Sequence, residues 1–320
     1  MTNTSITEEL GNGITVVDTG LMADDMVACY LMQSDGEVAI IETGNYQTCE
    51  RLLMVLSEKQ IAPEQVKYVI VTHIHLDHAG GASHLMHALP NATLLVHPSG
   101  VKHMANPAKL VAASTQVYGE ARFRAMYGDI TAIAEDRIIA IQDDATMQLG
   151  QRLLRFRHTP GHAYHHMCIF DEEHSAWFTG DTFGLCYRAM KCAADMPFII
   201  PTTTPTQFDP EALKASIRLL LENRPTFMLL THHGQVRIDD HDYIEHWLIK
   251  QIEDFCAITK DSVPTLENHH QLVELLMDYY LELIAEKQLK LEPEVARNLL
   301  AMDLELNAQG LWYWHQKHFS

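Results

Sequence analysis

The sequence predicts an α+β protein with one large domain and a helical appendage at its C-terminal end. Short apolar and β-branched runs alternate with turns and helical stretches from residue 14 to residue 231, whereas only helical periodicity is visible from about residue 262. A chain of 320 residues, 47% hydrophobic and 20% charged, can bury a sizeable core but is short for two full domains. We therefore expect a large domain over residues 1–260 and a helical extension over residues 261–320.

The strands and helices of the large domain can be placed from their periodicity. Strands are expected where apolar runs are bounded by turn residues, over residues 14–17, 27–32, 38–41, 68–71, 94–97, 138–141, 153–157, 167–170, 176–179 and 227–231. Helices are expected over residues 46–60, 82–88, 107–127 and 210–222. Asp209 is the expected N-cap of the last of these, with Pro210 at its first position. The helical stretch over 107–127 could form a wall or lid over a site.

Two further helices make up the extension. The first carries one apolar stripe made of Leu272, Leu275, Leu276, Tyr279 and Leu283. The second begins at Pro293 and is expected to stop near Gly310. Their apolar surface, which includes Trp312 and Trp314, has to be covered by the large domain, by a second copy or by the edge of a site. We expect a homodimer, with an intramolecular cap as the alternative.

Charge and cysteine usage argue against several classes of protein. The chain has 23 Lys and Arg against 42 Asp and Glu, and a net charge of -19 would repel a phosphate backbone, so no nucleic-acid partner is expected. No window approaches the ~20 apolar residues that cross a membrane, and residues 1–10 do not resemble a secretory signal. The six cysteines form no Cys-x-x-Cys pair, which fits thiols in a reducing compartment. We expect a cytoplasmic protein.

Four potential metal ligands follow the buried strand over 68–71 within six positions: His73, His75, Asp77 and His78. Alternate residues of a strand point the same way, so His73 and His75 can share one target. A turn after Leu76 can redirect the next two side chains toward an adjacent target. This arrangement suits two metal ions side by side, whereas a His-x-His pair alone would be typical of a solvated loop.

Three later segments each place a His or Asp beside glycine, directly after an expected strand. They are Thr159-Pro160-Gly161-His162, Thr179-Gly180-Asp181-Thr182 and Thr231-His232-His233-Gly234. Each alone is typical of a turn or cap. Together with the first cluster, in this order, they predict a metal centre at the ends of several strands.

These motifs resemble the metallo-β-lactamase superfamily, with its His-x-His-x-Asp-His, Gly-His, Gly-Asp and final loop His, and most closely its glyoxalase-II-like hydrolases. The resemblance covers roughly residues 13–260 and implies a four-layer αββα sandwich with metals at one edge between the sheets. By position it implies a first metal held by His73, His75 and His162, a second held by Asp77, His78 and His232, and Asp181 bridging them. His233 is the alternative to His232 and otherwise lines the pocket or supports the ligands.

One motif departs from the family pattern. Relatives usually have Asp-Thr-Gly at the end of an early strand, whereas this chain has Glu42-Thr43-Gly44. If Glu42 orients ligands through hydrogen bonds, its longer side chain should shift the local packing.

The ligand set predicts a dinuclear hydrolase. Neutral imidazoles and carboxylates suit zinc first, with iron or manganese as alternatives. Two divalent ions ~3.5 to 4 Å apart would supply a bridging hydroxide that cleaves a small ester, thioester or lactone, with Asp77 and Asp181 as the catalytic carboxylates. The alternatives are an iron-dependent oxidoreductase, either persulfide dioxygenase-like or diiron, and a regulatory or binding protein of low turnover.

Contacts to a small-molecule substrate are the least determined part of the prediction. Tyr118, Tyr127, Phe183 and Arg188 could line a pocket for a polarised or anionic group. Core packing is the competing interpretation for the aromatic residues, and a solvated surface charge is the competing interpretation for Arg188.

Overall fold

The computed structural model describes residues 6–190 and 196–319, apart from the side chains of residues 117 and 118. The chain divides into two compact units, each described by itself below. The sheet unit comprises Met1–His158, His165–Gly180 and Phe227–Gln235, and the helical unit comprises Thr159–Tyr164, Asp181–Thr226 and Val236–Ser320. The expected boundary at residue 260 stays a prediction. Among the described residues, no helix has the length and apolar content needed to cross a membrane.

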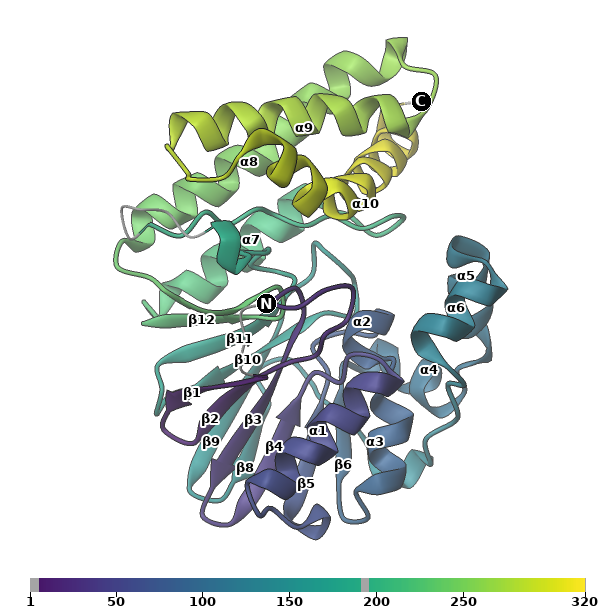
Figure 1. Ribbon diagram of the computed structural model, residues 1–320, viewed down its shortest axis with the longest axis vertical. Coiled ribbons are helices and arrows are strands. Elements are labelled where there is room, and N and C mark those ends of the chain that lie inside the picture. The colour runs from purple at the N-terminus through teal and green to yellow at the C-terminus, as the bar shows by residue number, and fades with distance from the viewer. Residues whose placement is uncertain (1–5, 191–195, 320) are drawn as a thin grey trace. The chain divides into compact units, whose positions relative to one another are not determined.

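The first sheet has seven strands in sequential order, of which Figure 1 draws β1 to β6 in purple to blue. They are β1 (Thr7–Gly11), β2 (Ile14–Asp18), β3 (Ala28–Ser34), β4 (Glu37–Ile41), β5 (Val66–Ile70), β6 (Thr93–Val96) and β7 (Ile138–Ala140). The pairs from β1 to β4 are antiparallel, and those from β4 to β7 are parallel. The carboxyl ends of β4, β5 and β6 therefore meet at one edge of this sheet.

The second sheet has six strands in the order β13-β12-β11-β10-β9-β8. Their bounds are β8 (Thr146–Leu149), β9 (Arg152–His158), β10 (Met167–Asp171), β11 (Ala176–Gly180), β12 (Phe227–Leu230) and β13 (Gly234–Arg237). Because β9, β10 and β11 alternate in direction and β12 runs parallel to β11, the carboxyl ends of β9, β11 and β12 share one edge. Three strands were not predicted, β1, β8 and β13, because these edge strands are short and mostly polar.

The helices of the sheet unit are α1 (Tyr46–Glu58), α2 (Leu76–Ala79), α3 (Ala82–Ala88), α4 (Val101–Ala105), α5 (Ala108–Tyr118) and α6 (Glu120–Tyr127). Asn45 begins α1 with a capping box that it shares with Thr48. The single helix expected over 107–127 is wrong, because the chain breaks at Gly119 between α5 and α6. Gly119 has a φ of +77°, a left-handed conformation that ends a helix and that favours glycine.

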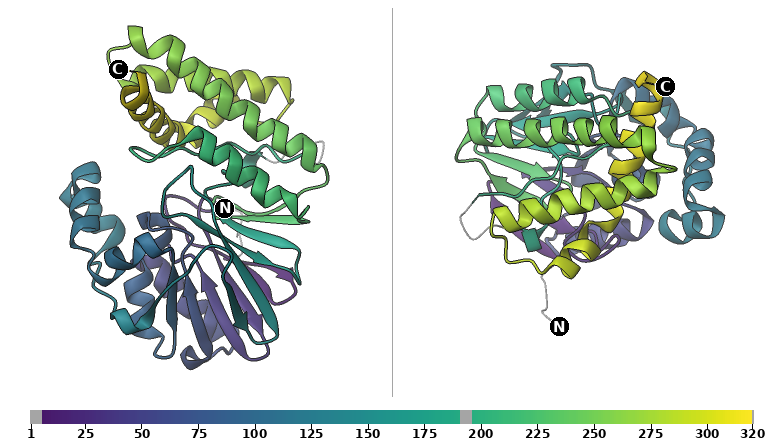
Figure 2. Two further views of the ribbon diagram at one scale, coloured as in Figure 1. Left: turned by 180° about the vertical axis from the view of Figure 1, so that it is seen from behind. Right: turned by 90° about the horizontal axis from the view of Figure 1, so that it is seen from above.

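Two large hydrophobic clusters lie in the described part of the sheet unit. One lies between the sheets, where Tyr30 and Ile70 of the first sheet join the same cluster as Phe156 and Phe178 of the second. The other lies on the outer face of the first sheet, where Leu52 of α1 and Leu85 of α3 pack against its strands. Figures 1 and 2 show α1 and α3 beside that sheet. The α+β sandwich with two sheets flanked by helices, followed by C-terminal helices, is confirmed.

Backbone hydrogen bonds join the two sheets at the edge where the ligand motifs emerge. The amide of Met167 donates to the carbonyl of Thr72 at 2.8 Å, and the amide of Ala28 donates to the carbonyl of Thr231 at 2.7 Å. The segments after β5 and β12 are therefore fixed against strands of the opposite sheet.

The helical unit contains α7 (Pro210–Glu222), α8 (His241–Ser262), α9 (His269–Glu286) and α10 (Pro293–Phe319). As predicted, Asp209 caps α7 by accepting from the amides of Glu211 and Ala212. The predicted end of the last helix near Gly310 is wrong, because α10 continues to Phe319. A Cβ at Gly310 would lie 2.4 Å from Oγ1 of Thr203 and 2.8 Å from the carbonyl oxygen of Thr204, so this glycine permits a close approach inside the helix.

The five cysteines in the described part of the chain form no disulfide. Those of Cys29, Cys49, Cys168 and Cys186 are buried and that of Cys256 is half-buried, whereas Cys192 lies outside the described residues. Burial raises the pKa of Cys49 and of Cys256 to about 12, so both stay protonated and unreactive near neutral pH.

The close approach at Gly310 predicts that alanine at this position destabilises the protein, although alanine has the higher helix propensity. A glycine-to-alanine change inside a helix normally stabilises by up to about 1 kcal/mol. We expect Gly310→Ala to destabilise instead, by roughly 1–3 kcal/mol, because the new methyl group would meet backbone that cannot move aside. Urea unfolding measures the sign of the change in the free energy of unfolding. Ala301→Gly, at an exposed position of α10, reports the ordinary propensity, and a more stable Gly310→Ala protein would contradict the packing.

Candidate metal centre

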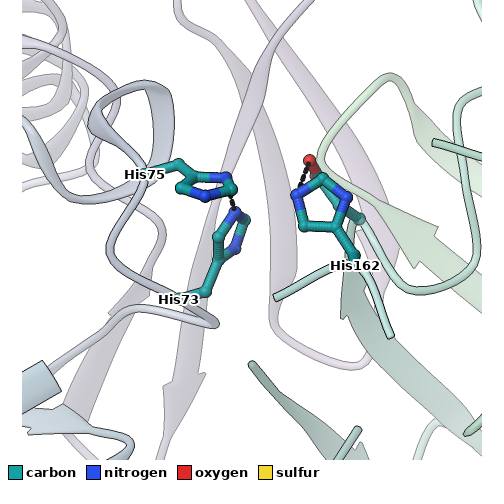
Figure 3. A group of neighbouring side chains, drawn as sticks. His73, His75 and His162 are labelled. Atoms are coloured by element: carbon teal, nitrogen blue, oxygen red, sulfur yellow. Dashed lines mark hydrogen bonds and ion pairs between the residues drawn. The ribbon is translucent and has the colours of Figure 1, made fainter. Parts of the chain in front are cut away.

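The first histidines of the site follow β5 in the sheet unit. His73 is fully buried, and its Nε2 lies 2.8 Å from Nδ1 of His75. Figure 3 shows the two rings turned toward one another, joined by a dashed line. Two histidine nitrogens of different type thus converge on one point, as the alternation of side chains along an extended segment predicts.

A hydrogen-bond chain fixes the ring of His73. The Thr72 hydroxyl donates to a carboxylate oxygen of Glu42, so its oxygen can accept from Nδ1–H of His73 at 3.1 Å. In a neutral imidazole only one nitrogen carries hydrogen. This tautomer leaves the lone pair of His73 on Nε2, the atom that faces His75.

A second group of ligand atoms lies beside the first in the chain. The short helix α2 begins at Leu76 and turns Asp77 and His78 away from the preceding segment. One ligand atom each of Asp77, His78 and His232 lies within 4.8 Å of the others. His232 enters this group from the segment after β12, as expected from its position at the same edge of the sheet unit.

The tautomers of this group fit a cation. Nδ1 of His78 donates to Glu42 at 3.0 Å, and Nδ1 of His232 donates to the carbonyl of Met26 at 3.1 Å. Both Nε2 atoms then direct lone pairs toward Oδ2 of Asp77, 3.5 Å from each. Three electron-rich atoms that face one another repel, whereas a divalent ion among them would bind all three.

Two further ligand candidates lie in the helical unit. Nε2 of His162 is 3.2 Å from Oδ2 of Asp181, and both side chains are buried. Thr202 donates its hydroxyl hydrogen to the carbonyl of Asp181, so its oxygen accepts from Nδ1–H of His162 at 3.0 Å. The same logic therefore directs the Nε2 lone pair of His162 toward a carboxylate oxygen. His162 and Asp181 thus form the part of the predicted ligand set that lies in the helical unit, whereas His73 and His75 belong to the sheet unit.

Chain connectivity ties these two residues to the ends of strands. The segment Thr159–Tyr164 leaves β9 after His158 and returns at His165, and Asp181 directly follows Gly180, the last residue of β11. Both segments start from strand ends that share one edge of the second sheet. Figure 3 also draws His162, with a dashed line of its own to a carboxylate oxygen.

The last helix supports the segment that holds Thr202. Asn307 of α10 accepts from the amide of Thr203 at 2.7 Å and donates to the carbonyl of Pro201 at 3.1 Å. Asn307 is buried, and the close approach at Gly310 lies one helical turn further along. The C-terminal extension thus holds the loop that orients His162.

Glu42 occupies the place at which relatives usually have aspartate. Its side chain is 1% exposed, and its backbone has a φ of +66°, which is unusual for a residue other than glycine. The carboxylate accepts hydrogen bonds from Thr72, His78 and Thr231. The longer side chain of glutamate therefore reaches partners on both sheets while its backbone takes the left-handed conformation.

Two buried histidines were missed by the sequence analysis. His166 is fully buried, with its ring stacked 4.8 Å from that of His73, and the amide of Ile74 donates to Nδ1 of His165 at 3.5 Å. Both follow His162 closely, so the spacing His162-x-x-His165-His166 was the available signal.

The expected pocket residues have different surroundings. Tyr127 is buried in a small cluster with Phe123 and Leu76. Leu76 directly precedes Asp77 in the sequence. Phe183 is fully buried and Arg188 is half-buried in the helical unit, while the side chain of Tyr118 lies outside the described residues. Their roles toward a substrate stay predictions.

The position of Glu42 generates a prediction about metal affinity. Glu42→Gln keeps the shape of the side chain but removes the charge that holds the Nδ1–H of His78. We expect the affinity for a divalent metal to fall by about 10–100-fold, as for other residues that orient ligands. Competition with a chelator measures the metal affinity of each variant. Glu37→Gln, at a half-buried ion pair with Lys67 elsewhere on the first sheet, is the matched control. Equal affinities of both variants would refute the role of Glu42.

A pair of neighbouring variants separates His232 from His233. Nε2 of His232 faces Asp77, whereas Nε2 of His233 lies 3.6 Å from Oδ1 of Asp25. We expect His232→Ala to lower the metal content per chain and His233→Ala to leave it unchanged. Elemental analysis measures the content, and circular dichroism confirms that both variants are folded. The reverse pattern would make His233 the ligand.

Comparison with known proteins gives the same family. Residues 22–232 match the family model of the metallo-beta-lactamase superfamily. The chain is 27% identical over 177 residues, 54% of its own length and 62% of the relative's, to a metallo-beta-lactamase fold-containing protein of Sulfurisphaera tokodaii. It is 30% identical over 118 residues, 35% of this chain and 40% of the relative, to an acyl-coenzyme A thioesterase of Gallus gallus. An atrochrysone carboxyl ACP thioesterase of Aspergillus fumigatus is 27% identical over 159 residues, 48% of this chain and 38% of the relative. The matches thus cover less than two thirds of each of these relatives.

Solved structures share the fold over nearly the whole chain. A metallo-beta-lactamase family protein of Thermus thermophilus matches with a TM-score of 0.67 and 16% identity, over 97% of this chain and 95% of the other. An archaeal superfamily protein of Sulfolobus tokodaii matches with a TM-score of 0.63 and 21% identity, over 94% of this chain and 98% of the other. Since the family model covers more than half of a chain that also has the superfamily's fold, this protein belongs to the metallo-beta-lactamase superfamily.

Proposed function

We propose that this chain is a dinuclear metal-dependent hydrolase. The first metal would be held by His73, His75 and His162, the second by Asp77, His78 and His232, with Asp181 between them. The observation that carries the proposal is the arrangement around Asp77, where two histidines with Nδ1 fixed as a donor direct their Nε2 atoms at one carboxylate oxygen. Nitrogen and oxygen ligands of this kind suit zinc first, and iron or manganese next.

Chain connectivity supports the proposal that His162 and Asp181 belong to the same metal centre as the ligands of the sheet unit. His162 lies in a short segment between two strands of the sheet unit, and Asp181 is bonded to the last residue of β11. Both residues are therefore only a few residues of chain away from strand ends of the second sheet. A centre with ligands from several strand ends is therefore the simplest use of these side chains.

The chemistry divides between the metals and the protein. Bound divalent ions would lower the pKa of a bound water to ~7 and polarise a substrate carbonyl. The side chains of this chain orient the histidines, since each Nδ1–H has a fixed acceptor and Nε2 is left facing a carboxylate. Asp77 is 27% exposed at its side chain, so it can orient the attacking water and accept its proton. Asp181 is buried beside His162 and would be a ligand in this centre.

We infer that the bond cleaved is an acyl bond, with a thioester first and an ester or lactone next. Relatives named as an acyl-coenzyme A thioesterase and an ACP thioesterase support this order. A thioester carbonyl is attacked readily and leaves a thiolate that needs little protonation. A single small-molecule substrate, a homodimer and a cytoplasmic location stay predictions.

Metal counting with activity tests the proposal. In protein purified without added metal or chelator, we expect about two zinc ions per chain and hydrolysis of an acyl-thioester reporter that a chelator abolishes. Asp77→Asn should lower kcat by about 10²–10⁴-fold, because the substitution removes both a ligand charge and a proton acceptor. Asp35→Asn, at an exposed turn, is the control and should keep full activity.

Other results of the same measurements would favour a different function. About one iron per chain, with oxygen consumption instead of hydrolysis, would favour the oxidoreductase alternative. Two bound metals without turnover on thioester, ester and lactone panels would favour a binding protein. No metal in folded protein would reject the dinuclear centre.

A further inference from the structure

A third cluster of metal-ligating side chains lies in the helical unit, apart from the residues proposed for catalysis. It consists of His269 and His270 in the first turn of α9 and Glu305 in α10. Nε2 of His269 lies 2.7 Å from Oε1 of Glu305, and Nδ1 of His270 lies 3.2 Å from Oε2. One ligand atom of each residue is within 4.8 Å of the others.

The donors are held in place by their neighbours. Asn268 caps α9 by accepting from the amide of His270 at 3.1 Å, which fixes the backbone of the pair. Gln309, one turn after Glu305, donates to Oε1 at 2.8 Å and holds the carboxylate toward the histidines. The two imidazole rings lie 4.1 Å apart, tilted by 40°. The carboxylate thus presents a separate oxygen to each ring.

Exposure makes this cluster accessible to an ion from solvent. The side chains of His269 and Glu305 are 28% and 31% exposed, and that of His270 is 69% exposed. Two imidazoles with one carboxylate suit zinc and similar transition metals, whereas calcium and magnesium prefer oxygen ligands alone. Water would complete a four-coordinate shell.

The cluster links two helices that are distant in sequence. His269 is the first residue of α9, and Glu305 lies inside α10. These two helices pack against each other, as the green and yellow ribbons of Figure 1 show. An ion held by both helices would restrain the same helix, α10, whose Asn307 and Gly310 contact the segment that carries Thr202.

We propose that His269, His270 and Glu305 form a second, structural metal site for zinc or a similar transition metal, which fastens α9 to α10. It binds one ion per chain, independently of the centre proposed for hydrolysis. Occupancy stabilises the helical unit, since an ion that binds only the folded helices shifts the folding equilibrium.

The test is a zinc titration of the full chain with its purified metals retained. Isothermal titration calorimetry with Zn²⁺ should show one additional equivalent at micromolar or tighter affinity, together with a rise in Tm. Loss of a supporting residue alone weakens metal sites by about 10–100-fold, so loss of a ligand in His270→Ala or Glu305→Gln should weaken this site at least as much. His246→Ala removes an exposed histidine of α8 outside the cluster and should bind as the wild type does.

Two results would overturn the proposal. Absence of an additional equivalent would leave the cluster as hydrogen bonds between helices, and an additional equivalent retained in both variants would place the ion elsewhere. His270 is exposed, so its variant should fold, and Glu305→Gln keeps the side-chain shape as a second variant. Asp181→Ala should keep the additional equivalent while it loses the proposed catalytic metals, which separates failure of this site from failure of the proposed function.

Discussion

The buried carboxylate of Glu42 is the contact on which the candidate centre depends. It follows β4 of the first sheet and accepts hydrogen bonds from Thr72 after β5, from His78 in α2 and from Thr231 after β12 of the second sheet. A buried carboxylate is costly unless donors surround it, so the segments that supply these donors are held at fixed positions. The backbone bonds from Met167 to Thr72 and from Ala28 to Thr231 act at the same edge. The geometry of the ligands thus follows from the way in which the two sheets are joined.

The acceptors behind three of the histidines decide which ring nitrogen faces a carboxylate. Glu42, the carbonyl of Met26 and the hydroxyl of Thr202 each take an Nδ1–H, from His78, His232 and His162 respectively. Every one of these rings then directs Nε2 toward a carboxylate. The same preference for Nε2 in three places, produced by three chemically different acceptors, is difficult to explain as packing alone. A site that presents nitrogen lone pairs to cations requires this arrangement, which therefore supports the proposed metal centre.

Much of this could be predicted from the sequence, and the failures have physical causes. The central strands and the cap at Asp209 were predicted because burial on both faces produces long apolar runs, and because Pro210 after an aspartate marks a helix start. Edge strands β1, β8 and β13 bury less and carry no such run. The helix break at Gly119 and the uninterrupted helix through Gly310 show the two uses of glycine, a left-handed turn in one case and a close contact in the other. His165 and His166 were missed because their burial near His73 depends on where the loop after β9 returns.

The C-terminal helices have a structural role that their sequence alone does not reveal. Their apolar stripes indicate only that something must cover them, yet the polar contacts of α10 are more specific. Asn307 is buried and binds both the amide of Thr203 and the carbonyl of Pro201, on either side of the residue that orients His162. A buried amide side chain that satisfies a loop backbone fixes that loop more strictly than apolar contacts do, because its hydrogen bonds have both a direction and a length. The extension therefore supports the candidate centre through the loop over residues 201–204. A change that shifts α10 should alter the orientation of His162 more than that of His78 or His232.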